Sequence, residues 1–291
     1  MTHAPRIALI TAPDLPDLSL DERVLLHELQ RRGYDAQPVI WSDPAVNWRQ
    51  MDLAIVRSAW DAVRRPAAFL AWLDTVAVQV TLLNPPALIR WNLHKRYLFD
   101  LAERGVPIVP TVLAPQAHPL SLARLCDERG WTNVVIKPAI SASAFETFLV
   151  PAAHVAQGQR QLDALLLTHD MLIQPYLPTV VDVGERALVY IAGAFSHAGR
   201  KTPAITPTQP MGHDTITRER VEAASDERAL ADDVLATLPY PTLYARVDML
   251  RDTTDRLLLM ELEVIDPALY FGLCREAAPR LADALAARLP G

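Results

Sequence analysis

Acidic and basic side chains gather in one predicted hairpin near the C-terminal end of the sequence. Its strands span residues 243–250 and 257–265, and a short polar turn joins them. Strand side chains alternate between two faces, so Met260, Leu262 and Val264 are expected on a core-facing side. If the strands pair in register, the other side collects one guanidinium and three carboxylates, those of Arg246, Asp248, Glu261 and Glu263.

Three neighbouring carboxylates repel one another and lose hydration, and a cation relieves both effects. Hard oxygen ligands suit Mg²⁺, which proteins commonly hold with one or two carboxylates and substrate phosphates. An arginine beside such a metal suits a phosphoryl group in transfer. An antiparallel hairpin with a solvated outer face shows the same alternation. This segment alone leaves both interpretations open.

Two further segments carry groups that suit a nucleotide. Lys137 ends the predicted strand 133–138 and can reach a phosphate, while the small residues 141–144 can offer backbone N–H groups. A surface lysine before a plain turn is the simpler interpretation of Lys137 in isolation. The strand 171–177 is broken by Pro175, and its backbone and Gln174 can pair with a purine edge. An edge strand with a proline is the alternative.

Substrate contacts are expected in two other places. The run RSAWD follows a predicted buried strand, 52–57, and ligands of α/β folds lie beyond the carboxyl ends of strands. A helix-capping turn is the alternative there. At the entrance to the proline-rich loop 201–215, basic side chains can bind an anionic substrate or a phosphate. The candidates from both places are Arg57, Ser58, Trp60, Asp61, His197, Arg200 and Lys201.

Composition narrows the class of protein. A length of 291 residues suggests about two domains, and 51% hydrophobic residues are ample for their cores. The net charge of -6, without any block of like charge, argues against a nucleic-acid partner. No apolar run is long enough for a signal peptide or a membrane span, and the two cysteines form no metal-type pair. We therefore expect a soluble cytoplasmic protein, with a homodimer as the base-rate expectation.

Strands and helices alternate up to about residue 90. Strands are predicted at 6–11, 36–40, 52–57 and 79–83, and helices between them, which indicates a small parallel α/β domain. Farther along, we expect a strand at 106–111 and a helix at 218–238. The whole chain is thus expected to combine α/β and α+β parts.

In their order along the chain, these motifs resemble those of the ATP-grasp superfamily. The resemblance runs through Lys95, Lys137 with its Ser/Ala loop, Gln174-Pro-Tyr-Leu, Gly184-Glu-Arg, Arg246-Val-Asp and Glu261-Leu-Glu. It implies a pre-ATP-grasp domain at 1–90, a subdomain with the phosphate loop and adenine segment at 91–185, and a C-terminal subdomain with the metal site at 186–291.

The resemblance also implies ATP and Mg²⁺ as cofactors. It assigns phosphate contacts to Lys95, Lys137, Ser141 and Ser143, and adenine contacts to Gln174, Pro175, Tyr176 and Leu177. Asp182 or Glu185 would lie near the ribose. Asp248, Glu261 and Glu263 would bind Mg²⁺, and Arg246 and Lys201 are the catalytic candidates.

Two departures from the superfamily pattern stand out. Glu263 occupies a position where asparagine is common, and the phosphate loop ISASAFET lacks the usual glycines, which leaves its backbone less free. Within the superfamily, RSAWD, KPAISASAFET and MELEVIDPALYF are similar to the branch containing the cycloserine-forming O-ureidoserine cyclo-ligase.

The branch implies a small amino-acid substrate and an ATP-dependent ligase. Such an enzyme activates a carboxylate as an acyl phosphate for attack by a nitrogen nucleophile, here closing O-ureido-D-serine into D-cycloserine. One alternative is an intermolecular ligase joining an amino acid to an amine. Another, motivated by the two departures, is a nucleotide-binding module without catalysis.

Overall fold

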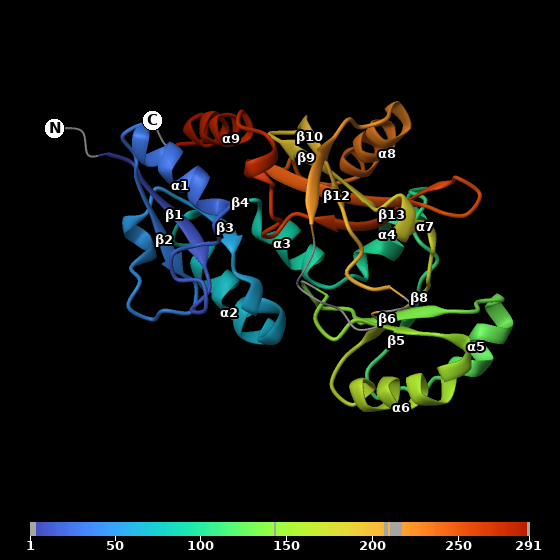
Figure 1. Cartoon of the computed structure of the whole chain (residues 1–291). Coiled ribbons are helices and arrows are strands. Elements are labelled where there is room, and N and C mark those ends of the chain that lie inside the picture. Colours follow the sequence, from blue (N-terminus) through green and yellow to red (C-terminus); the bar gives the residue numbers. More distant parts are fainter. Residues whose placement is uncertain (1–3, 143, 207–208, 210–216, 290–291) are drawn as a thin grey trace.

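The computed structural model describes residues 4–142, 144–206, 209 and 217–289. They form three β-sheets, two of four strands and one of five. Figure 1 shows the N-terminal sheet beside the other two, which lie one above the other. Each sheet comes from one continuous stretch of the chain, whereas the division into domains at residues 90 and 185 stays a prediction, as does the homodimer.

The first sheet is parallel, with strand order β2-β1-β3-β4. Its residues are β1 (Arg6–Thr11), β2 (Asp35–Ile40), β3 (Leu53–Ser58) and β4 (Thr81–Leu83), connected by α1 (Glu22–Arg31) and α2 (Pro66–Val76). The apolar runs of β1 and β3 suit a sheet that is covered on both faces. The predicted parallel α/β unit is confirmed.

Helices cover both faces of this sheet. On one face, Leu25 and Leu29 of α1 share a buried cluster with Leu281 of the last helix, α9 (Ala277–Ala286). A spacing of four residues places the two leucines of α1 on one side of that helix. On the other face, Phe69 of α2 meets Trp41 edge-on, with ring centroids 5.4 Å apart. The C-terminal helix therefore helps to build the N-terminal core (Figure 1).

The second sheet is antiparallel, with strand order β5-β8-β6-β7. Helix α5 begins after Ser121, whose hydroxyl accepts a hydrogen bond from the Arg124 N–H, and ends at Gly130 with φ +66°. The elements of this layer are β5 (Val112–Ala114), α5 (Leu122–Arg129), β6 (Val134–Pro138), β7 (Phe148–Val150), α6 (Val155–Leu166) and β8 (Met171–Pro175).

The third sheet is antiparallel, with strand order β11-β10-β9-β12-β13. Helix α8 packs its Ala231 and Val234 into the buried cluster that contains Val247 and Leu262 of the hairpin. The elements are β9 (Glu185–Ile191), β10 (Ala194–Lys201), β11 (Arg218–Val221), α8 (Ser225–Ala236), β12 (Tyr244–Arg251) and β13 (Leu257–Glu263). Between the sheets lie α3 (Pro86–Leu93), α4 (Tyr97–Glu103) and the short α7 (Thr179–Asp182).

Two predicted elements are wrong. Residues 106–111 form no strand but meet β13 through an isolated bridge between Ile108 and Leu259, because Pro107 and Pro110 have no N–H to donate. The predicted helix 218–238 begins only at Ser225, because the preceding residues pair with β10 as β11. Sheet pairing there overrides local helix propensity. The loop 201–215 lies partly outside the described residues.

The hairpin of β12 and β13 pairs in the predicted register at its charged positions. Arg246 lies opposite Glu263, and Asp248 lies opposite Glu261. The register then shifts, so that Met249 is opposite Leu259 and Met260 is the additional residue. A β-bulge turns this extra side chain out of the strict alternation. Met260 therefore borders a cavity instead of joining the core, which corrects the prediction for that residue.

The outer edge of β13 is covered by side chains and by one short segment. Asn92 of α3 donates to the Leu262 carbonyl (2.8 Å) and accepts from the Val264 N–H (3.1 Å). The Tyr97 hydroxyl accepts from the Leu262 N–H at 3.0 Å, and Leu259 exchanges backbone hydrogen bonds with residues 107 and 109. These contacts satisfy polar groups that an edge strand otherwise leaves unpaired.

Among the described residues, no helix is both long enough and apolar enough to cross a bilayer.

Candidate active site

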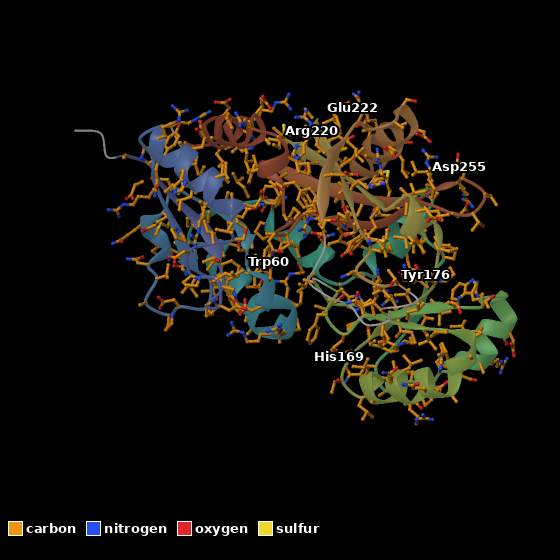
Figure 2. The ribbon with its side chains drawn as sticks, in the orientation of Figure 1. Trp60, His169, Tyr176, Arg220, Glu222 and Asp255 are labelled. Carbon is orange, nitrogen blue, oxygen red and sulfur yellow. The ribbon has the colours of Figure 1, made fainter. Side chains whose placement is uncertain are left out.

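A cavity of about 680 Å³ lies between the second and third sheets. Residues of β6 and β8 border it on one side and residues of β12 and β13 on the other, while loops of the first sheet close one end. Figure 2 marks two bordering residues from different layers, Trp60 and Tyr176. The predicted site residues found here are Trp60, Lys95, Lys137, Ser141, Gln174, Pro175, Tyr176, Leu177, Glu185, Lys201, Arg246, Asp248, Glu261 and Glu263.

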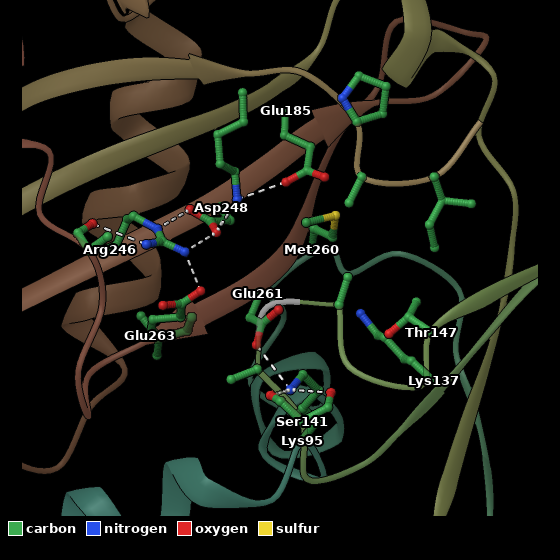
Figure 3. Close-up of a pocket in the computed structure, with 18 of the residues that line it drawn as sticks. Lys95, Lys137, Ser141, Thr147, Glu185, Arg246, Asp248, Met260, Glu261 and Glu263 are labelled. Atoms are coloured by element: carbon green, nitrogen blue, oxygen red, sulfur yellow. Dashed lines mark hydrogen bonds and ion pairs between the residues drawn. The ribbon is translucent and has the colours of Figure 1, made fainter. Parts of the chain in front are cut away.

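The residues of β13 mark successive positions along the cavity. Along β13 and beyond it, the residues that border the cavity include, in chain order, Met260, Glu261, Glu263 and Asp266. A strand advances about 3.3 Å per residue, so alternate side chains on one face are about 6.6 Å apart. Figure 3 shows the first three in this order. We name three parts of the cavity accordingly: the apolar end at Met260, the charged middle at Glu261 and Glu263, and the N-terminal end at Asp266. The last name refers to the loops of the N-terminal sheet, which close that end.

Arg246 is the centre of the charged middle. Its Nε and one terminal nitrogen each lie 2.9 Å from an oxygen of Asp248, and it also pairs with Glu263. Its other terminal nitrogen donates to the Ala268 carbonyl at 3.0 Å. Burial opposes the charge of Arg246, but the two carboxylates outweigh burial and raise its pKa. Arg246 is thus a fixed cation whose guanidinium borders the cavity.

Lys201 is fixed in a similar way. Its Nζ lies 2.7 Å from Asp248 and 2.8 Å from Glu185. Burial favours the neutral amine, yet these carboxylates outweigh it and raise the pKa of Lys201. Lys201 therefore stays charged and suits an anion better than a proton acceptor role.

Lys95 joins the Ser141 loop to the hairpin. Its Nζ donates to the Ser141 carbonyl at 2.6 Å and to the Ser141 hydroxyl at 3.2 Å, and lies 3.1 Å from Glu261. Burial raises the pKa of Glu261, but Lys95 and Lys137 more than offset this, so that it is lowered overall. Glu261 is therefore an ionised carboxylate facing two lysines.

Lys137 differs from the other cations of the cavity. Its side chain is buried, but no hydrogen bond or ion pair links its ammonium to any residue that the structure describes. Burial lowers the pKa of Lys137, and the attraction of Glu261 opposes that shift. Lys137 borders the cavity and makes no direct ion pair there with any described residue, so this position suits an anionic ligand.

Glu263 has a raised pKa, chiefly through burial and also through two neighbouring carboxylates. Burial, and then repulsion by Asp248 and Glu261 against the pull of Arg246, raises its pKa to about 7. A hard cation shared by Glu261 and Glu263 would remove that repulsion, and carboxylate oxygens suit Mg²⁺. As the described residues stand, no three His, Cys, Asp or Glu side chains converge as a ready ligand set. Both oxygens of Asp248 already accept hydrogen bonds, from Arg246 and Lys201.

The end of β8 borders the apolar end of the cavity. The Gln174 side-chain amide donates to the Thr111 hydroxyl at 2.9 Å, which leaves its carbonyl oxygen as an acceptor. The Tyr176 N–H already donates to the Asn133 carbonyl at 2.8 Å, so that group is not available to a purine. Leu177 and Met260 pack with Val109 and Leu250 in a small apolar cluster. An aromatic base fits such a wall.

Several predicted site residues lie outside the cavity, and they are corrected here. Arg57 is fully buried and paired with Glu22 at 2.6 and 2.8 Å, while Ser58 beside it is also fully buried. Asp61 accepts from the Trp41 indole and pairs with Arg65. These contacts hold the side chains in the structure and leave none of the three on the cavity wall.

The remaining corrections concern the third sheet and the segment before it. His197 is buried, and burial lowers its pKa to about 4, so it is neutral and unsuited to hold an anion. Arg200 pairs with Glu219, and Asp182 is exposed on α7, both away from the cavity wall. The prediction for Ser143 lies outside the described residues.

The cavity also contains polar residues that the sequence analysis missed. They include Asp14, Asn92, Thr147, Arg218, Asp266 and Tyr270. Asp266 could have been found, because it follows the predicted strand directly. No comparable local signal marks Arg218, which lies within a segment predicted to be helical.

Known proteins resemble the chain along nearly all of its length. The family model of the D-cycloserine synthetase DcsG N-terminal domain matches residues 7–84. The cycloserine biosynthesis protein DcsG of Streptomyces lavendulae is 32% identical over 97% of this chain and 98% of its own. The crystal structure of D-cycloserine synthetase DcsG matches with a TM-score of 0.90 at 30% identity, over 98% of this chain and 100% of that one.

A more distant likeness concerns the fold alone. The ATP-grasp ligase PsnB, in complex with a phosphomimetic variant of its minimal precursor, Mg and ADP, matches with a TM-score of 0.66 at 15% identity over 98% of each chain. With three sheets and a charged cavity between two of them, the chain has the fold of the ATP-grasp ligases. The 32% sequence identity to the relative from Streptomyces lavendulae over 97% of the chain also shows the family of the chain. It belongs to the D-cycloserine synthetase DcsG family.

Proposed function

We propose that the protein binds Mg-ATP in this cavity and cyclises O-ureido-D-serine to D-cycloserine, acting in the cytoplasm. The γ-phosphoryl group passes to the substrate carboxylate, which gives an acyl phosphate and ADP. The nitrogen bonded to the side-chain oxygen attacks the acyl carbon, loses its proton and displaces phosphate, which closes the ring. The carbamoyl group on that nitrogen leaves by hydrolysis as CO₂ and ammonia. Membership of the DcsG family supports this substrate.

The unpartnered ammonium of Lys137 is the observation that carries the nucleotide part of the proposal. It borders the same cavity as Lys95 and Arg246, and all three can hold phosphate oxygens. In this arrangement Lys137 and Lys95 bind the polyphosphate, and Gln174 and Leu177 bind the adenine. Glu185 stays the candidate for the ribose, although Lys201 already binds it.

Glu261 and Glu263 are proposed to hold Mg²⁺, with Asp248 as a third ligand once it releases a hydrogen bond. The bound ion would neutralise charge on the phosphoryl oxygens. Arg246 would stabilise the same group from the fixed position that Ala268 and Asp248 give it. Binding the carboxylate and the nitrogen nucleophile of one molecule in a folded conformation lowers the entropic barrier to ring closure.

The test is ADP release from Mg-ATP with and without O-ureido-D-serine, combined with mass analysis of the product. Substrate-dependent ADP and a cyclised product would support the proposal. ADP that forms only when a separate amine is added would indicate an intermolecular ligase, whereas ATP binding without any turnover would indicate a non-catalytic module.

Two variants test the metal assignment in the same assay. Asp248→Ala and Glu261→Ala should lose Mg-dependent turnover, while Glu219→Ala, an exposed carboxylate outside the cavity, should not. Full activity in the first two variants would exclude these residues as ligands.

A further inference from the structure

Asp266 borders the cavity at its N-terminal end and has no role in the chemistry described so far. Its Oδ2 is buried and accepts no hydrogen bond from any residue that the structure describes. The backbone around it is held in place, because the Asp266 carbonyl accepts a hydrogen bond from the Trp60 indole at 3.2 Å. One oxygen of the Asp266 carboxyl group is therefore not used by any residue that the structure describes.

The nearby cation of the protein does not use this capacity. The Arg57 guanidinium donates to Glu22 and to the Pro267 carbonyl, and its closest carboxylate contacts are those with Glu22. Among the described residues, no cation lies within ion-pair distance of Asp266. Burial raises the pKa of Asp266 to about 6, against the pull of Arg57 and the Ala59 N–H. A carboxylate in this state gains from a cation that arrives with the ligand.

The position of Asp266 along the chain sets its distance from the chemistry. It follows Glu263 by three residues, and three residues span at most about 10 Å when extended. An amino-acid substrate with its carboxylate in the charged middle carries its ammonium on the adjacent carbon. That ammonium can therefore lie toward Asp266, at the end of the cavity away from the apolar end. Asp14 also borders this region, but it is exposed and hydrated.

We propose that Asp266 binds the α-ammonium group of the amino-acid substrate and so selects amino acids over carboxylic acids that lack the amine. This inference rests on the proposed function for the position of the substrate carboxylate. It gives the N-terminal end of the cavity a specificity role, since the ammonium and the carboxylate of one substrate would be held at two fixed points.

The test compares O-ureido-D-serine with its deamino analogue, 3-(ureidooxy)propanoate, in the wild type and in Asp266→Asn. We expect kcat/KM for the amino acid to fall about tenfold to hundredfold in the variant, through KM, because a charge-assisted hydrogen bond is lost. The value for the deamino analogue should stay within about threefold of wild type, which also shows that the variant is folded. KM for ATP should not change.

Asp61→Asn is the matched control. It removes a negative charge that is close enough to affect the pKa of Asp266, but Asp61 does not border the cavity. Its preference for the amino acid should equal that of the wild type. An equal preference in Asp266→Asn, or an equal fall with both substrates, would overturn the inference and leave Asp266 with a structural role.

Failure of the proposed function gives a different result. In that case the wild type releases no ADP with O-ureido-D-serine. Binding of D-alanine and of propanoate is then compared by calorimetry with Mg-ADP present. Tighter binding of D-alanine by the wild type, lost in Asp266→Asn, would uphold ammonium recognition. Equal binding of the two by the wild type would reject it.

Discussion

Arg57 and Arg246 are two buried arginines in similar surroundings, for which we propose different roles. Each pairs with carboxylates, and each guanidinium lies over a tyrosine ring, at 4.5 Å from Tyr244 for Arg57 and 5.2 Å from Tyr270 for Arg246. Only Arg246 borders the cavity. Ion pairing alone therefore does not distinguish the arginine that we propose to be catalytic from the other, whereas access to the cavity does.

The partners of Arg57 explain its structural role. It projects from β3, binds Glu22 at the start of α1, and donates to the Pro267 carbonyl beyond β13 at 2.7 Å. The guanidinium thus ties the first sheet to the segment that carries the proposed metal ligands. We expect changes at Arg57 to alter stability and changes at Arg246 to alter turnover.

The largest effect is expected from Arg246→Met. Loss of an arginine that stabilises a phosphoryl group in transfer reduces kcat by about 10³-fold or more. ADP release under saturating Mg-ATP and substrate measures the effect. Arg200→Met removes an arginine of the third sheet that lies outside the cavity, and it should keep kcat near that of the wild type. A loss of less than tenfold in Arg246→Met would remove Arg246 from the proposed chemistry.

Arg57→Met should act on stability instead. Removing one partner of a buried ion pair leaves Glu22 uncompensated and lowers the free energy of unfolding by about 3–5 kcal/mol. Urea unfolding measures this change, and kcat per folded molecule at low temperature should remain near that of the wild type. Normal stability with a large loss of kcat would reverse the roles that we give to the two arginines.

The double variant Glu22→Leu/Arg57→Met sharpens the same point. Replacing both charges with apolar side chains removes the uncompensated carboxylate, so at least about 2 kcal/mol of the loss in Arg57→Met should be recovered. Urea unfolding of the single and double variants measures the recovery. If the losses in unfolding free energy add up in the double variant, the pair contributes more to stability than the neutralisation of its two charges.

The smallest effect concerns Asp266, which lies between the two arginine networks. Its pKa is raised from 3.8 to about 6, so the folded state binds its proton more tightly than the unfolded state does. Stability contributed by the protonated carboxyl is present below pH 4 and is lost as pH rises through 6. The wild type should lose about 2 kcal/mol relative to Asp266→Asn over this range. Thermal unfolding between pH 4 and pH 7 measures it, and parallel profiles would contradict the shift.

Local periodicity predicted the charged face of the hairpin but not its departure from periodicity. Side chains of a strand alternate between two faces whatever its distant neighbours are. Alternation alone was therefore enough to predict the shared face of Arg246, Asp248, Glu261 and Glu263. Met260 was misplaced because a one-residue bulge depends on how two strands pair, which no single strand reveals.

Long-range partners account for the other errors. The prediction of a substrate contact for Arg57 is wrong because its side chain pairs with Glu22, which lies 35 residues earlier in the chain. The residues of β11 have no local signal for a strand, because their partner strand β10 lies across a loop. The order of motifs gave the fold and most of the cavity, whereas exposure of each side chain to the cavity depends on tertiary packing.

The covered edge of β13 has a consequence for how the chain can be divided. Asn84 donates to the carbonyls of Tyr244 and Val264, which follow it by 160 and 180 positions. Asn92 makes hydrogen bonds with the backbone of Leu262 and Val264. A fragment that begins after these asparagines would leave this edge open to pairing with another copy. We therefore expect the C-terminal portion to need the asparagines of the preceding segment for its own sheet edge.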